Sequence, residues 1–320
     1  MINPLFSVVV PTYNRAEKLL RCLRSLNAQT YTNFEVIICD DGSEDQTKEI
    51  VDNFRSGINF KKLYYFFDTN WGGPARPRNK GVKESTAEWI CFLDADDAWY
   101  PEKLQSIIPF LIGFDLIYHD FNLVGPSGKL RPMSSRQLKP PVFNDQMLNG
   151  HNGCIINSGV CIRKSIVEKV GGVSEDRQLI GVEDADLWLR IARITDLFKY
   201  IPLQLGYYHL DGGNLTIYNN TMINKLQYLF SIHSPYLQNN RLISQAKKTN
   251  DYHAGRIKEM MGNYREALVL HISSLKSPSK KLAIRSIFWI VYLYGKLFFF
   301  YLRGSKKINH HPSLGNNVFD

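Results

Sequence analysis

Three short apolar runs, each followed at once by polar residues, constrain the fold of this chain more than any other feature. Residues 5–10, 36–39 and 89–93 carry no charged side chain and are rich in Val, Ile, Leu and Phe. Uninterrupted apolar runs of this kind are typical of strands that are buried on both faces of a parallel sheet. We therefore expect a central sheet that is covered on both sides.

Segments with helical spacing alternate with these runs. Leucines within residues 19–26 recur at helical spacing, and Asn14 with Glu17 predicts an N-terminal cap for that helix. The other predicted elements are a helix that follows Ser43 and runs through Phe54, a strand near 63–67, helices after Pro74 and Pro101, strands at 115–119 and 158–163, and a helix at 185–194. Residues 125–141, rich in Pro, Gly and Ser, are expected to form a long loop. The alternation predicts an open α/β sheet.

The charge is divided unequally along the chain and indicates two domains. Residues 1–210 hold 24 Lys and Arg against 25 Asp and Glu, whereas residues 211–320 hold 15 against 5, so the last third accounts for the formal net charge of +9. We expect a catalytic domain over residues 1–215 and a basic region over 216–320 that is mainly helical from Met222 to about residue 303. A nucleic-acid-binding protein would spread its positive charge over an aromatic surface, so no nucleic-acid partner is expected.

The cysteines and the N-terminus indicate a reducing compartment. The five cysteines are odd in number and lack the C-x-x-C spacing of a zinc site or redox motif, so we expect buried, reduced thiols. The first strand is predicted to begin at Leu5, which leaves no room for the segments of a secretory signal. A cytoplasmic location is expected.

Polar residues follow three of the predicted strands, at 11–14, 40–43 and 94–97. Ligands of open α/β sheets bind outside the carboxyl ends of the strands, so these segments are expected to share one crevice. Five aspartates would then repel one another unless a cation neutralises them, and Mg²⁺ or Mn²⁺ suits such oxygen ligands. Taken singly, the same residues would be turn, cap and solvated-loop residues.

Together the three segments resemble the signature of family 2 glycosyltransferases. The motifs are SVVVPTYNR at residues 7–15, VIICDDGS at 36–43 and FLDADD at 92–97, and the likeness covers about residues 5–210. The resemblance implies the GT-A fold, a Rossmann-like open α/β sheet, here with a C-terminal helical extension. It also implies inverting transfer of a sugar from a nucleotide diphosphate-sugar, usually UDP-linked, with Mn²⁺ or Mg²⁺ as cofactor.

The resemblance assigns roles to individual residues of these motifs. Those with a role in donor or metal binding are Pro11, Thr12 and Tyr13 in the nucleotide pocket, Asp41 at the base, Asp94 near the ribose, and Asp96 as metal ligand with Asp97 beside it. The chemistry agrees, because a ring such as Tyr13 stacks on a pyrimidine and a carboxylate accepts a hydrogen bond from its ring N–H.

Residues 181–190 (GVEDADLWLR) resemble the family's Glu-Asp motif before a helix. The resemblance implies that Asp184 deprotonates the acceptor hydroxyl, with Glu183 and Asp186 as competing candidates. Acids in the first turn of a helix also stabilise the helix dipole, which is the alternative explanation.

Two basic candidates complete the predicted site. Residues 70–79 resemble the family's glycine-containing segment, in which Arg78 rather than Arg76 is expected to contact the nucleotide or its phosphates. His209 is expected to bind the metal or the diphosphate, with a purely structural role as the alternative. The acceptor pocket is expected near residues 125–141 and 151–157.

Residues 286–302 are apolar and aromatic and have basic residues on both sides. The run contains Lys296 and is marginal for crossing a bilayer about 30 Å thick. We expect it to lie in the interface of an anionic membrane, at the inner face of the cell membrane, with a core or oligomerisation helix as the alternative. Such attachment suits a growing surface glycan or a lipid-linked saccharide as acceptor.

Competing functions lack their own motifs. A nucleotidyltransferase would need a Gly-rich basic loop after the first strand, and a dinucleotide-binding oxidoreductase would need G-x-G-x-x-G there, but residues 11–14 provide neither. A non-enzymatic basic module that binds membrane or nucleic acid is the remaining alternative.

Overall fold

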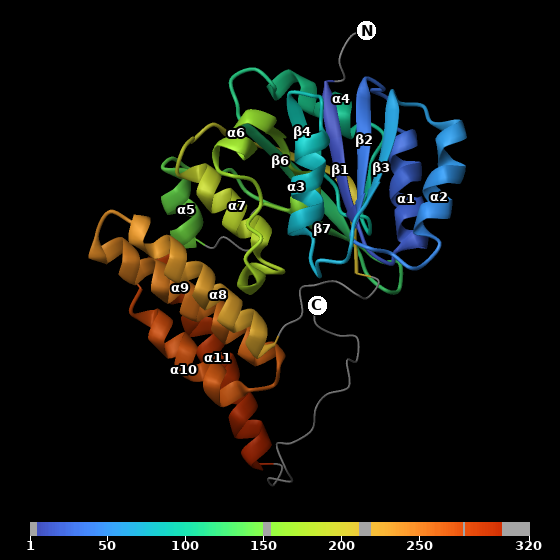
Figure 1. Ribbon diagram of the computed structural model, residues 1–320. Coiled ribbons are helices and arrows are strands. Elements are labelled where there is room, and N and C mark those ends of the chain that lie inside the picture. Colours follow the sequence, from blue (N-terminus) through green and yellow to red (C-terminus); the bar gives the residue numbers. More distant parts are fainter. Residues whose placement is uncertain (1–4, 150–154, 211–218, 278, 303–320) are drawn as a thin grey trace. The chain divides into compact units, whose positions relative to one another are not determined.

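The computed structural model describes residues 5–149, 155–210, 219–277 and 279–302 (Figure 1). The chain divides into two compact units, Met1–Gln146 with His151–Leu215 and Met147–Gly150 with Thr216–Asp320. The first unit contains every strand in the described part of the chain, and the second is helical.

One sheet organises the first unit. Its strands are β1 (Phe6–Thr12), β2 (Phe34–Asp40), β3 (Lys62–Phe67), β4 (Trp89–Phe92), β5 (Ala98–Trp99), β6 (Leu116–Val124), β7 (Leu130–Met133), β8 (Cys161–Arg163) and β9 (Phe198–His209). The order is β3-β2-β1-β4-β8-β6-β9-β5, and β7 pairs with β6. The four strands β3-β2-β1-β4 are parallel, with β2 on one side of β1 and β4 on the other. The carboxyl ends of β1 and β4 therefore flank a switch point, where ligands of open sheets bind.

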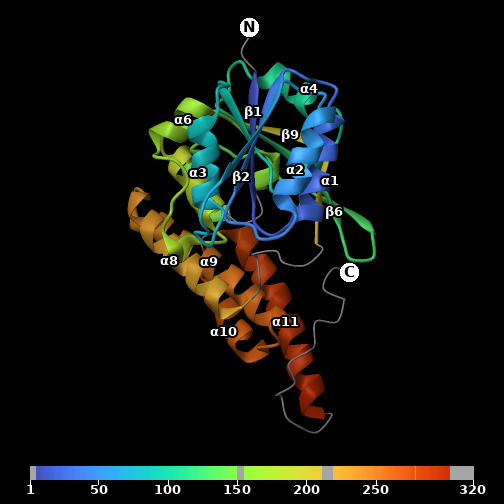
Figure 2. The same cartoon turned by 45° about the vertical axis from the view of Figure 1, so that its right-hand side comes forward.

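Helices cover both faces of the parallel strands. The helices before residue 150 are α1 (Ala16–Asn27), α2 (Thr47–Phe54), α3 (Ala75–Glu84), α4 (Lys103–Ile107) and α5 (Val142–Asn149), and α6 (Lys164–Lys169) and α7 (Glu183–Ala192) follow. Short 3₁₀ turns are η1 (Arg55–Gly57), η2 (Ile108–Phe110), η3 (Asn157–Gly159), η4 (Arg177–Leu179) and η5 (Ser234–Tyr236). Figure 2 shows α3 on one side of β1 and β2, and α1 with α2 on the other.

The packing of β1 explains why its apolar run is unbroken. Val8 and Val10 belong to the same hydrophobic cluster as Leu19 of α1. Val9 points to the opposite face, where a Cβ on Gly81 of α3 would lie only 2.3 Å from its Cγ1. Both faces of the strand are thus buried, as its sequence predicts.

The start of α1 differs from the prediction that Asn14 caps it. The N-cap is Arg15, and its side chain makes no capping hydrogen bond to the helix. Asp45 Oδ2 instead accepts a hydrogen bond from Ala16 N at 2.9 Å, while Asn14 has φ +48° and its Oδ1 accepts from Glu44 N. The connections that follow β1 and β2 are therefore bonded to each other.

Two further expectations required correction, and one is confirmed. The predicted loop 125–141 contains β7, which pairs with β6, and the predicted strand 158–163 begins as the turn η3 and becomes extended at β8. Four cysteines, Cys22, Cys39, Cys91 and Cys161, are free and buried, as predicted. Cys154 lies outside the described residues.

The second unit consists of α8 (Asn220–His233), α9 (Asn240–Met260), α10 (Tyr264–Leu275) and α11 (Lys280–Leu302), which confirms the predicted helical character. α10 packs against both α9 and α11. The hydroxyl groups of Ser274 and Ser286 lie 2.7 Å apart, and Trp289 Nε1 donates to Tyr252 Oη at 3.1 Å. These buried polar contacts fix the register of α11 on its neighbours.

Candidate active site

The turn after β4 lies at the switch point of the sheet. Leu93 N donates to Val9 O at 3.1 Å, so the chain leaves β4 beside β1, and a turn closed by Asp97 N and Asp94 O follows. Asp96 and Asp97 are buried, and Asp94 is partly exposed. Three carboxylates therefore lie in one tight turn, which we call the acidic turn (Asp94–Asp97).

A buried arginine joins the acidic turn to the start of α7. Arg78 on α3 donates from Nη2 to Asp94 Oδ1 at 2.7 Å and from Nη1 to Glu183 Oε1 at 2.6 Å. Burial by itself lowers the pKa of Arg78, but the two carboxylates outweigh it and raise the pKa. Arg76 is exposed and pairs with Glu175. Arg78 thus has a fixed place in the site, and its contact with a nucleotide stays a prediction.

Of the three acids at the start of α7, Asp184 is the most accessible. Glu183 is buried against Arg78, and Asp186 is buried and paired with Arg190 at 2.8 Å. Asp184 is partly exposed. Desolvation in the site, and then the charge of Glu183, raise the pKa of Asp184 to about 7. A carboxylate with this pKa suits proton abstraction near neutral pH.

Ser158 holds the acidic turn from the other side. Its Oγ donates to Asp97 Oδ2 at 2.5 Å and accepts from Asp94 N at 3.1 Å. Its neighbour Asn157 donates to Asp94 Oδ1 at 3.1 Å, and the backbone N of His209 donates to Asp97 Oδ1 at 3.3 Å. Sequence reasoning missed Ser158, because a single hydroxyl in an apolar stretch belongs to no motif. A role of the His209 ring stays a prediction, and residues 211–216 of its segment lie outside the described residues.

Asp96, the predicted metal ligand, forms an ion pair with Arg15. Burial raises the pKa of Asp96, and the guanidinium of Arg15 opposes the shift. Among the described residues no three His, Cys, Asp or Glu side chains are arranged to hold a metal ion. Mg²⁺ that is bound to substrate phosphates needs only one or two protein carboxylates. The oxygens of Asp96 fit that kind of ion, shared with a substrate, rather than a closed protein site.

The predicted nucleotide residues lie at the ends of β1 and β2. Pro11 and Thr12 are buried in β1, whereas Tyr13 follows directly and its side chain is 45% exposed. Asp41 accepts hydrogen bonds from the backbone N of Trp71 at 2.9 Å and of the next residue at 3.1 Å. Asp41 therefore anchors the loop before α3, and the ring of Tyr13 is open to a stacking partner.

Of the five aspartates expected to crowd together, three lie in the acidic turn, and Asp40 and Asp41 have separate partners. Asp40 accepts from Tyr65 Oη at 2.6 Å and from Ser43 N at 2.8 Å, and Asp41 accepts the two backbone groups described above. Local hydrogen bonds thus stabilise both of these carboxylates. Within the turn, burial and then the charges of its other two acids raise the pKa of Asp97 well above its usual range.

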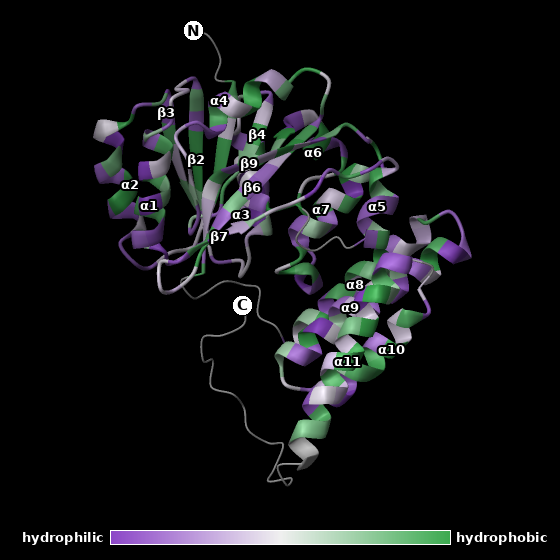
Figure 3. Cartoon of the chain, turned by 180° about the vertical axis from the view of Figure 1, so that it is seen from behind, coloured by the Kyte–Doolittle hydropathy of each residue, from purple (hydrophilic) through white to green (hydrophobic). Residues whose placement is uncertain are grey.

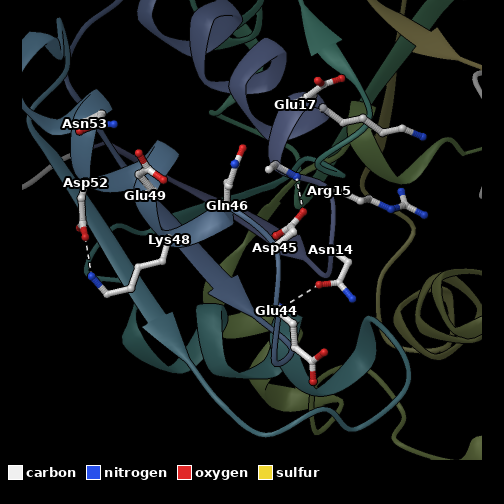
Figure 4. A pocket seen from close by; sticks show the side chains of 12 residues that line it. Asn14, Arg15, Glu17, Glu44, Asp45, Gln46, Lys48, Glu49, Asp52 and Asn53 are labelled. Carbon is white, nitrogen blue, oxygen red and sulfur yellow. Dashed lines mark hydrogen bonds and ion pairs between the residues drawn. The ribbon is translucent and has the colours of Figure 1, made fainter.

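A surface pocket of about 1000 Å³ opens beside the N-terminal end of α1 and along α2 (Figure 4). Its lining mixes acidic and basic side chains, among them Arg15, Asp45 and Lys48. The predicted nucleotide, metal and base residues all lie in the described part of the chain, and none of them lines it. The pocket is therefore distinct from the switch point, although Arg15 belongs to both.

Comparison with known sequences identifies the family. The sequence model of glycosyl transferase family 2 matches residues 7–171, just over half of the chain. The chain therefore belongs to glycosyl transferase family 2 and is a glycosyltransferase. Family membership decides against the nucleotidyltransferase, oxidoreductase and non-enzymatic alternatives.

Two curated relatives match at different lengths. The amylovoran biosynthesis glycosyltransferase AmsB of Erwinia amylovora is 33% identical over 215 residues, which cover 64% of this chain and 69% of AmsB. The poly(ribitol-phosphate) β-N-acetylglucosaminyltransferase TarS of Staphylococcus aureus is 41% identical over 142 residues, which cover 44% of this chain and 23% of TarS.

Solved structures confirm the predicted GT-A sheet and helical extension. A TarS fragment in complex with UDP-GlcNAc gives a TM-score of 0.60 at 18% identity and covers 94% of this chain and 92% of the fragment. The mannosyltransferase PcManGT from Pyrobaculum calidifontis, in complex with GDP-Man and Mn²⁺, gives 0.59 at 16% identity and covers 95% of this chain and 89% of that one. At these identities the likeness concerns the fold.

The Ser158 contacts lead to a stability prediction. Ser158→Ala leaves Asp94 N and Asp97 Oδ2 without a buried partner, so we expect the free energy of unfolding to fall by about 1–3 kcal/mol. Urea unfolding followed by circular dichroism measures the change. Ser56→Ala, which removes an exposed hydroxyl, is the control and should change stability by less than about 0.5 kcal/mol. Equal unfolding curves for the two variants would contradict the role given to Ser158.

Proposed function

We propose that the protein transfers a sugar, with inversion, from a UDP-linked donor to a hydroxyl of a growing surface glycan or lipid-linked saccharide, with Mn²⁺ or Mg²⁺. The observation that carries the proposal is the Arg78 bridge, which holds the acidic turn and the start of α7 together at the switch point. AmsB and TarS are named for amylovoran and poly(ribitol-phosphate), which supports a polymer acceptor. Nucleotide-sugars in the TarS and PcManGT structures support the donor class.

The donor would lie over the ends of β1, β2 and β4. The exposed ring of Tyr13 would stack on the base, and Asp41 would accept a hydrogen bond from its N–H. Asp94 would lie near the ribose. Asp96, with His209 as a second candidate, would hold the divalent ion, whose charge stabilises the diphosphate leaving group.

The acceptor would meet the donor at the start of α7. Asp184 would take the proton of the acceptor hydroxyl, from the side of the sugar opposite the diphosphate. Arg78 bonds Glu183, the residue before Asp184, and so fixes the backbone that carries the base. A base held in place in this way stays within hydrogen-bonding distance of a bound hydroxyl.

Donor turnover tests the proposed function. We expect metal-dependent release of UDP from a UDP-sugar, and a loss of about 10²–10⁴-fold in kcat/KM for Asp184→Asn, because the variant has no base. Asp184→Asn should bind UDP as the wild type does, whereas Asp96→Asn should bind it more weakly in the presence of Mn²⁺. Asp52→Asn, an exposed acid on α2, is the control. Wild-type activity in both active-site variants would refute the roles proposed for Asp184 and Asp96.

The raised pKa of Asp184 gives the reaction a pH dependence. Only the ionised carboxylate accepts a proton, so kcat/KM should fall about tenfold per unit below pH 7 and level off above it. An aspartate with its ordinary pKa near 3.9 would leave kcat/KM unchanged over the same pH range. A profile of kcat/KM from pH 5.5 to 8.5 decides between them, and a flat profile would remove Asp184 as the base.

We also propose that α11 attaches the enzyme to an anionic membrane. Leu282, Ser286 and Leu293 on one side of α11 are buried. Apolar side chains that are each more than half exposed recur on the other side at intervals of three and four residues, at Ile284, Ile287, Phe288, Val291, Tyr294 and Phe298. We call them the α11 stripe, and Figure 3 shows the apolar colour along this helix.

The packing of α11 favours a position in the membrane interface. By length and composition α11 would reach across a membrane. Its buried side, however, is packed on α10 through Ser286 and Ser274, so only the stripe is available to lipid. Exposed Lys280, Lys281 and Arg285 at its start would each gain about 1 kcal/mol from anionic headgroups. Arg303, Lys306 and Lys307 lie outside the described residues.

Flotation with liposomes tests this attachment. The double change Ile287→Asp with Val291→Asp should release the protein from phosphatidylglycerol vesicles, because it places charge in the stripe. Val269→Asp on α10, where the side chain is also 66% exposed, is the matched control and should float as the wild type does. If the stripe variant floats as the Val269→Asp control does, membrane attachment by α11 is wrong. The same holds if the only effect of the stripe variant is to dissociate an oligomer in solution.

A further inference from the structure

The carboxylate of Asp96 already has a cationic partner within the chain, the guanidinium of Arg15. Arg15 is the N-cap of α1, and Asp96 follows it 81 residues later in the acidic turn. The side chain of Asp96 is 12% exposed and that of Arg15 is 24% exposed. The pair therefore lies at the rim of the site, where the guanidinium is accessible to a ligand.

Hydrogen bonds hold the backbone on both sides of Arg15, whereas its side chain is partly exposed. Asn14 N donates to Ser43 Oγ at 2.8 Å, and Ala16 N donates to Asp45 Oδ2 at 2.9 Å. Figure 4 shows the Arg15 side chain pointing away from Asp45 and the acids of α2. Arg15 also lines the open pocket of about 1000 Å³ and its side chain is 24% exposed, so the protein does not enclose it.

Arg15 differs in this respect from the other partners of the acidic turn. Asp94 is bound by Arg78, whose side chain is 5% exposed, and Asp97 is bound by Ser158 in the interior. A guanidinium and a divalent ion compete for the same carboxylate oxygens. A fully buried arginine would block the approach of an ion to Asp96, whereas a partly exposed one can exchange with it.

We propose that Arg15 is a built-in counter-ion of Asp96 that leaves when a divalent cation binds and then contacts the diphosphate of the donor. The inference rests on the proposed function, in which Asp96 is the metal ligand. The planar fork of the guanidinium suits phosphate oxygens as well as carboxylates. Releasing Arg15 weakens cation binding when no nucleotide is present, and the diphosphate offsets that cost. The cation and the nucleotide therefore strengthen each other's binding through Arg15, in addition to their direct contact.

Direct measurement of Mn²⁺ binding tests this exchange in the full-length protein. Free Mn²⁺ is followed by electron paramagnetic resonance, without nucleotide and then with UDP. Arg15→Gln removes the competing cation, so Mn²⁺ alone should bind about tenfold more tightly. Arg15→Lys keeps the charge but loses the planar fork, so its affinity for Mn²⁺ should lie between those of Arg15→Gln and the wild type. In Arg15→Gln, UDP should strengthen Mn²⁺ binding less than it does in the wild type.

Arg24→Gln is the matched control, because it removes an exposed arginine from the same helix and should leave Mn²⁺ binding unchanged. Equal or weaker Mn²⁺ binding by Arg15→Gln overturns the inference and leaves the proposed function standing. If neither the wild type nor the variants bind Mn²⁺, the inference and the proposed metal dependence both fail. Circular dichroism checks folding, and if Arg15→Gln does not fold, Arg15→Lys decides by the same comparison with the wild type.

Discussion

The site depends on the buried guanidinium of Arg78. It extends from α3 and bonds two carboxylates that follow it by 16 and 105 residues, Asp94 in the acidic turn and Glu183 at the start of α7. The planar fork fixes the direction of both bonds as well as their length. Without this cation the buried Glu183 and the partly exposed Asp94 would lie close together without a counter-ion, which is more costly than the loss of a surface ion pair. The distance between the acidic turn and the start of α7 is thus set by one side chain.

The acidic turn shows how a protein keeps several carboxylates close together. Each acid has a partner of a different kind: Arg78 for Asp94, the hydroxyl of Ser158 for Asp97, and Arg15 for Asp96. The two arginines differ in exposure, because the side chain of Arg78 is 5% exposed and that of Arg15 is 24% exposed. Of the two arginines, the one that pairs with Asp96 is therefore the more accessible to a charged ligand.

Much of this arrangement follows from the sequence, because it depends on local patterns. The unbroken apolar run of β1 predicts burial on both faces, and the three motifs at strand ends predict the GT-A sheet. The rest depends on contacts between distant segments. Asn14 and Glu17 form a plausible cap, but Asp45 from the next connection supplies the bond to Ala16 instead. Likewise β7 contains Pro132 in a stretch rich in loop residues, and it becomes a strand by pairing with β6.

The two backbone hydrogen bonds to Asp41 have a consequence for the choice of nucleotide. They hold the carboxylate in place, and a carboxylate only accepts hydrogen bonds. Under the proposed assignment, Asp41 would favour bases that present a ring N–H at their pairing edge, as uracil and guanine do. Cytosine and adenine present a lone pair at the equivalent ring nitrogen and would be repelled. Under this assignment the loop that carries Trp71 would contribute to base selection by holding that carboxylate in position.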